Sequence, residues 1–125
     1  MIRMDQVSMQ YSTGVDALCD VSIRIEKGEF VFVVGKSGSG KSTFIKLLLK
    51  ELNPSEGRIF VAGRQVTNLS RKQVSLYRRQ IGVVFQDFRL LKNKTVYENI
   101  EFAQQIIGMN KREIARNVAI MLEMV

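Results

Sequence analysis

The sequence contains no histidine and only one cysteine, Cys19, among its 125 residues. A single cysteine cannot form an internal disulfide, which favours a reducing compartment. No histidine is present to activate the thiol. We therefore expect Cys19, which lies between Leu18 and Val21, to be a small core residue rather than a nucleophile.

Long hydrophobic runs are also absent. No apolar stretch approaches the length of a membrane span. The N-terminal residues MIRMDQVSMQ lack the apolar stretch of a secretion signal. We therefore expect a cytosolic protein. With 46% hydrophobic residues, 125 residues are enough for one compact domain with its own core.

Acidic residues are the minority charge, 12 against 19 basic residues, and the net charge is +7. This balance suits a nucleotide, a nucleic acid or an acidic membrane surface, and does not choose among them. Several basic residues fall on expected helices and are interpreted as solvated faces: Arg71, Lys72, Arg78, Arg79, Lys111, Arg112 and Arg116. Because no exposed aromatic residues are interleaved with them, no nucleic-acid partner is expected.

Three apolar segments predict strands, and a fourth segment predicts a hairpin. VSIRI at 21–25 alternates, as in a half-buried antiparallel strand. FVFVV at 30–34 does not alternate and predicts a strand covered on both faces, as in a parallel sheet, and IGVVFQ at 81–86 predicts another buried strand. Residues 58–66, with Gly63, are typical of a short hairpin or a strand followed by a turn.

One apolar segment and two capping boxes predict helices. KSTFIKLLLKEL at 41–52 is apolar nearly all round, so it predicts a largely buried helix, which Asn53-Pro54 should end. Two capping boxes predict further helices: Ser70-x-x-Gln73 before 71–79 and Thr95-x-x-Glu98 before 96–107.

A last helix is expected at about 111–124. Its apolar residues recur at helical spacing: Ile114, Val118, Met121 and Val125. The sequence stops on Val125 with no glycine cap and no polar tail. We expect more protein to follow this apolar face.

The segment GKSGSGKS at 35–42 matches the phosphate-binding pattern G-x-x-x-x-G-K-[ST] between an expected strand and an expected helix. Its glycines allow the backbone amides to converge on a phosphate, and the helix adds the positive end of its dipole. Lys41 is expected to reach the β- and γ-phosphates, and Ser42 to offer its hydroxyl to Mg²⁺. The residues expected to bind the nucleotide here are Gly35, Lys36, Ser37, Gly38, Ser39, Gly40, Lys41, Ser42 and Thr43. Lys36 and Ser37 are expected to act through their amides.

Three segments together resemble the nucleotide-binding domain of ABC-type ATPases: VSMQYSTGVDALCDVSIRIEKGEFVFVVGKSGSGKST, RRQIGVVFQDFRLL and KTVYENI. The resemblance covers essentially the whole chain and is most specific in VVFQDFRLL. It implies an α/β P-loop NTPase fold of the ABC type. This fold would have an N-terminal antiparallel β-subdomain and a partial core sheet with helices, truncated before the Walker B motif.

The resemblance also implies that the chain is the N-terminal part of a single ABC ATPase domain. The expected parts are β-subdomain strands at about 1–34 and 57–67, the P-loop and its helix at 35–52, a Q-loop strand at 81–91, and the start of the helical subdomain at 95–125.

Two further site residues follow from the resemblance. Tyr11 falls where the family places an aromatic ring that stacks on adenine, although alone it could be a surface tyrosine near a strand end. Gln86 falls at the Q-loop, where its amide oxygen could join Ser42 as a Mg²⁺ ligand, although alone it could be a polar residue that ends a strand. The expected catalytic residues are Lys41 and Gln86. The following apolar residues would face a membrane partner by resemblance but otherwise suggest core: Phe88, Leu90 and Leu91.

Several parts of a complete ATPase are not found in these residues. The family's Walker B Asp and Glu, its glycine-rich signature and its switch histidine are expected beyond residue 125. Asp87 follows an apolar run but belongs to the Q-loop segment, and Leu69-Ser70-Arg71-Lys72-Gln73 lacks the glycines of the signature. We expect this chain to bind ATP or ADP with little or no turnover, and the full-length family to hydrolyse ATP.

The resemblance is strongest to the cell-division members of the family. It implies an ATP-binding subunit that forms a homodimer around MgATP in the full-length protein. This subunit would contact an integral membrane partner through its Q-loop region, and so be cytoplasmic and peripheral on the inner face of the plasma membrane. The alternatives are an ATPase of a lipoprotein or peptide exporter and a non-catalytic interaction module. A small P-loop kinase fits the Q-loop pattern poorly. The 125 residues alone are expected to self-associate, because a strand edge or apolar face would be uncovered.

Overall fold

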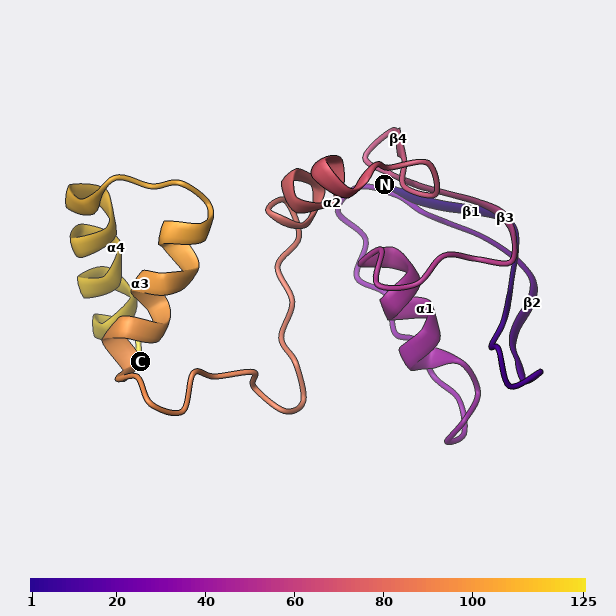
Figure 1. Ribbon diagram of the computed structural model, residues 1–125, viewed down its shortest axis with the longest axis horizontal. Helices are drawn as coiled ribbons and strands as arrows, with labels where there is room; N and C mark the ends of the chain where they lie inside the picture. Colours follow the sequence, from indigo (N-terminus) through magenta and orange to yellow (C-terminus); the bar gives the residue numbers. More distant parts are fainter. The chain divides into compact units, whose positions relative to one another are not determined.

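The computed structural model describes residues 1–125, which form two compact units, Met1–Ile81 and Gly82–Val125 (Figure 1). The first unit holds a β-sheet and two helices, and the second holds two helices. No helix is both long enough and apolar enough to cross a membrane.

An antiparallel sheet organises the first unit, with its strands in the order β2-β1-β3-β4. The strands are β1 (Ile2–Gln10), β2 (Asp16–Ile25), β3 (Glu56–Val61) and β4 (Arg64–Gln65). Ile2 pairs with Ile25 on one side and with Val61 on the other, so β1 is an inner strand, as is β3. The antiparallel strand predicted at 21–25 and the hairpin predicted at 58–66 are confirmed.

Helix α1 (Lys41–Leu48) buries one face within this unit. Its side chains Phe44 and Leu47 join a core formed with Met4, Val7, Met9, Ile59, Val66 and Tyr77. The last of these lies on α2 (Arg71–Arg78). Burying each such side chain contributes about 1.5–3 kcal/mol, so α1 is held mainly by this apolar face.

The end of α1 differs from the prediction. The helix stops at Leu48, before Asn53-Pro54, because Lys50 adopts a left-handed conformation with φ of 55°. Ile45 is 43% exposed, so the helix is amphipathic rather than buried all round.

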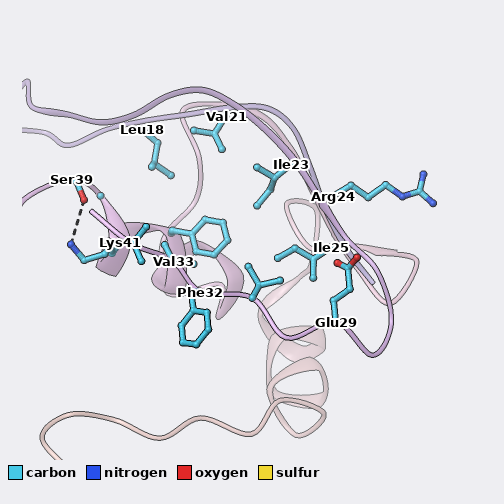
Figure 2. A pocket seen from close by; sticks show the side chains of 14 residues that line it. Leu18, Val21, Ile23, Arg24, Ile25, Glu29, Phe32, Val33, Ser39 and Lys41 are labelled. Carbon is cyan, nitrogen blue, oxygen red and sulfur yellow. Dashed lines mark hydrogen bonds between the residues drawn. The ribbon is translucent and has the colours of Figure 1, made fainter. Parts of the chain in front are cut away.

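The strand predicted at 30–34 is wrong for this structure. These residues form no strand, and Phe30 and Phe32 are 84% and 78% exposed. Val33 and the β2 residues Leu18, Val21 and Ile23 line an apolar groove (Figure 2). The groove has a volume of about 490 Å³. Residues 31–34 and β2 thus border the same groove, but none of β1–β4 supplies the backbone partners that a strand needs.

The strand predicted at 81–86, within the proposed 81–91 segment, is also wrong for the same reason. These residues pair with no strand, and Val84 is 97% exposed. Cys19 likewise corrects its prediction, because it lies exposed on β2 rather than in the core.

The second unit consists of α3 (Val96–Ile106) and α4 (Lys111–Glu123), which pack side by side (Figure 1). The Thr95 capping box is confirmed, since Thr95 N donates to Glu98 Oε2 at 2.8 Å and Glu98 N donates to Thr95 Oγ1 at 3.2 Å. Asn110 forms an equivalent box at the start of α4, which the sequence analysis missed.

The apolar face of α4 is only partly covered. Ile114 and Val118 are buried, whereas Met121 and Val125 are exposed. The predicted spacing therefore identified the first half of the buried face correctly.

Candidate nucleotide-binding site

The glycine-rich loop leads directly into α1 and lines a pocket in the first unit. The pocket has a volume of about 370 Å³ and is lined by Tyr11, Val15, Asp16, Ala17 and the run from Ser37 to Thr43. The structure thus brings Tyr11 together with most of the loop residues that the sequence predicted.

Gly40 fixes the loop against strand β2. Its φ is +88°, and a Cβ placed there would lie 2.4 Å from the carbonyl oxygen of Ala17 and 2.9 Å from Leu18 Cδ2. Only glycine satisfies both the left-handed conformation and the close approach. This contact determines where α1 begins relative to the sheet.

The N-terminus of α1 is open to an anion. Gly40 is the N-cap residue, it makes no side-chain capping bond, and the first turn contains no acidic residue. The first helical bond runs from Phe44 N to Gly40 O at 2.8 Å. The amides of Lys41, Ser42 and Thr43 precede it, so they are the donors that a helix leaves without internal partners.

Lys41 folds back over the loop. Its Nζ donates to the carbonyl oxygens of Gly35 and Lys36, each at 2.7 Å, and lies 3.4 Å from Ser39 Oγ (Figure 2). The ammonium group therefore lies at the centre of the loop, and phosphate oxygens could replace the carbonyl oxygens as its acceptors.

Tyr11 and Thr43 make a contact that the sequence analysis did not predict. Tyr11 Oη and Thr43 Oγ1 lie 2.9 Å apart in a hydrogen bond. The two residues are 32 positions apart, so no local pattern signals the bond. It connects the half-buried ring of Tyr11 to the first turn of α1.

Gln86 lies outside this unit, in an exposed turn of residues 82–125. Its approach to Ser42 therefore stays a prediction. Phe88 and Leu90 are 75% and 62% exposed, and Leu91 is also exposed, so reading them as core residues is wrong for this structure. Arg89 stacks over the ring of Phe85, with its Cζ 3.8 Å from the ring centroid.

The donor set near the loop fits a magnesium ion that is carried mainly by phosphate. No group of three or more His, Cys, Asp or Glu side chains in residues 1–125 could hold a metal ion. Magnesium commonly keeps several waters and binds phosphates with one or two protein ligands. The exposed hydroxyl of Ser42, one residue after Lys41, suits that role.

A comparison with protein families decides the assignment. Residues 18–125 match the sequence profile of the ABC transporter family. The chain belongs to the ABC transporter family. The α/β P-loop fold of ABC ATPases, predicted from the sequence, is confirmed.

Curated members of this ABC transporter family match the whole chain. It is 46% identical over 125 residues to the cell division ATP-binding protein FtsE of Streptococcus pneumoniae, covering 54% of that protein. It is 45% identical over 125 residues to FtsE of Bacillus subtilis, covering 55% of that protein. The chain thus spans about half the length of the curated relatives it matches.

A solved ABC structure matches the fold. The ATP-binding cassette MJ0796, in a dimeric post-hydrolysis state bound to ADP and Pi, superposes with a TM-score of 0.88 at 31% identity. The match covers 99% of this chain and 56% of MJ0796.

Proposed function

We propose that this chain binds ATP and ADP as their magnesium complexes, as the nucleotide-binding portion of an FtsE-like ABC ATPase. The observation that carries the proposal is the loop at the start of α1. Gly40 is packed against Ala17, the helix N-terminus is uncapped, and Lys41 lies over the loop carbonyls.

Each residue of the site has a proposed part. The amides of residues 36–43 donate to phosphate oxygens, and Lys41 exchanges its carbonyl contacts for the β- and γ-phosphates. Ser42 would hold Mg²⁺, with Gln86 as a second ligand. Tyr11, held at Thr43 by its hydroxyl, presents its ring to the base. The Mg²⁺ ion would neutralise part of the negative charge of the phosphates.

A calorimetric titration of MgATP into this chain tests the proposal. Lys41→Ala should abolish measurable binding, because it removes the cation at the centre of the loop. Lys46→Ala is the matched control, since Lys46 is an exposed lysine in the last turn of the same helix. Equal binding by the wild type and Lys41→Ala, or no binding by the wild type, would contradict the proposal.

Turnover is a separate proposal for these residues. We propose that they bind nucleotide without efficient hydrolysis, and that the carboxylates and histidine used by the family for hydrolysis belong to the remainder of a full-length protein. Phosphate release that survives purification and disappears in Lys41→Ala would overturn this.

In the full-length protein, we propose a dimer that encloses two MgATP molecules and transmits closure to an integral membrane partner resembling FtsX, at the inner face of the plasma membrane during cell division. The similarity to FtsE and the dimeric state of MJ0796 support this. The contact would use the exposed side chains of Phe88, Leu90 and Leu91.

Co-purification from membranes tests the partner. Leu90→Asp in the full-length protein should reduce recovery of the membrane partner while MgATP binding is retained. Asp87→Asn, a neighbouring exposed substitution, is the control. Undiminished recovery with Leu90→Asp would count against this contact, and recovery of a different exporter would favour the alternative ABC assignment.

A further inference from the structure

The C-terminal end of α1 is built in an unusual way. Glu51 N donates to Lys46 O at 2.8 Å, and Lys50 N donates to Leu47 O at 3.0 Å. These two bonds form a Schellman motif, in which the left-handed position is usually glycine. Here Lys50 occupies it with φ of 55°. A lysine in this conformation persists only where the surroundings hold it.

Two consecutive residues of α2 cap the remaining carbonyl groups. Tyr77 Oη donates to Leu48 O at 2.5 Å, Arg78 Nε donates to Leu49 O at 2.8 Å, and Arg78 Nη2 donates to Lys50 O at 3.0 Å. Burial raises the pKa of Tyr77 to about 12, so its hydroxyl stays a donor at neutral pH. The guanidinium charge also lies at the negative end of the helix dipole.

The side chain of Lys50 adds a third anchor. Its Nζ donates to Thr67 O at 2.6 Å and also to Asn53 Oδ1. The end of α1 is thus fixed to α2 and to the segment that precedes α2. All these contacts lie within the first unit.

We propose that Arg78 is a positioning residue for the phosphate-binding loop. Helix α1 has eight residues and is only about 12 Å long. With Phe44 and Leu47 packed on the core, a displacement of its C-terminal end must tilt the whole helix. The amides of Lys41–Thr43 would then move away from the phosphate. This inference rests on the proposed nucleotide site.

The matched variants are Arg78→Met and Arg79→Met. Arg79, the next residue, is also exposed, but it does not donate to the carbonyl groups at the end of α1. In the 125-residue chain without nucleotide, Arg78→Met should shift the NMR amide signals of Gly38, Gly40 and Lys41, whereas Arg79→Met should leave them unchanged. Shifts confined to α2 and the last turn of α1 would overturn the proposal.

Ligand titration supplies the second readout. Arg78→Met should weaken MgADP binding by about three- to thirty-fold, while adenosine, which lacks phosphates and touches α1 only through the bond between Tyr11 and Thr43, should lose clearly less affinity. Arg79→Met should change both by less than about twofold. A purely structural role for Arg78 would weaken the binding of both ligands by the same factor or of neither, and either result would overturn the proposal.

A conservative variant guards against misfolding. Arg78→Lys keeps the charge but has a single donor nitrogen in place of the guanidinium fork, so it should give intermediate loop shifts and an intermediate loss of MgADP affinity. Loop signals identical to the wild type in Arg78→Lys, with Arg78→Met unfolded, would overturn the proposal. Failure of the wild type to bind MgADP would refute the proposed function, and the unliganded amide shifts would still decide the role of Arg78.

Discussion

Residues 1–81 and residues 82–125 bury their apolar side chains in different ways. The first unit combines strands and helices distant in sequence around one cluster that includes Met4, Leu47 and Tyr77. The second has two helices, in which Ile114, Val118 and Gln104 are the buried residues. The phosphate loop belongs to the unit with the larger core, so we expect it to stay ordered when the helical pair opens.

Of the variants that test this difference between the two units, Leu47→Ala should have the largest effect on stability. Leu47 is fully buried, and its truncation should lower the unfolding free energy of the first unit by about 2–5 kcal/mol. Segment-resolved hydrogen exchange should show faster exchange across residues 1–81 only. Ile45→Ala, on the exposed side of α1, is the control. Equal effects of the two variants would mean that α1 does not pack as described.

Gly40→Ala should come next. The left-handed conformation alone costs an alanine about 1–2 kcal/mol, and the Cβ would additionally collide with Ala17 O. Gly38→Ala is the matched control, because Gly38 has φ of 79° but open space around it. Thermal unfolding should show a greater loss for Gly40→Ala. Identical losses would argue against the contact between the loop and β2.

Val118→Ala should affect the other unit. Removing the buried side chain should cost about 1.5–3 kcal/mol. Because the buried set there is small, α3 and α4 should exchange rapidly while residues 35–48 keep their protection. Loss of protection at the loop in this variant would show that the two units unfold together.

Acid should produce the smallest change, at the start of α3. The hydrogen bond from the backbone of Thr95 lowers the pKa of Glu98 most, and the hydrogen bond from the Lys94 side chain comes second. Together they bring it from 4.5 to about 2. The charged form is favoured in the folded state, so its stabilisation is present above pH 4.5 and is lost as the pH falls toward 2. Exchange of the α3 amides should accelerate in this window. Glu98→Gln keeps an acceptor and should remove the pH dependence, and an unchanged dependence would exclude Glu98 as its cause.

Local patterns predicted much of this fold and site. The alternation at 21–25, the Thr95 capping box and the glycine-lysine loop each depend only on residues close in sequence, so the sequence alone predicted them. The strands at 30–34 and 81–86 were wrong because a strand also requires a neighbouring backbone, which β1–β4 do not offer.

Long-range polar contacts were the other gap. Arg78 was interpreted as part of a solvated face, yet its guanidinium caps α1 from 29 residues away. The bond between Tyr11 and Thr43 likewise depends on how the sheet places two distant segments. Neither contact has a spacing rule, and both became visible only in the folded chain.

The most direct test of the account is hydrogen exchange of the whole chain with and without MgATP, alongside Lys41→Ala. We predict protection centred on residues 35–48 that Lys41→Ala abolishes, and a change around Gln86 would support its proposed role as a magnesium ligand. Protection that is absent from the loop, or that persists in Lys41→Ala, would contradict the claim that these residues form a phosphate-binding site.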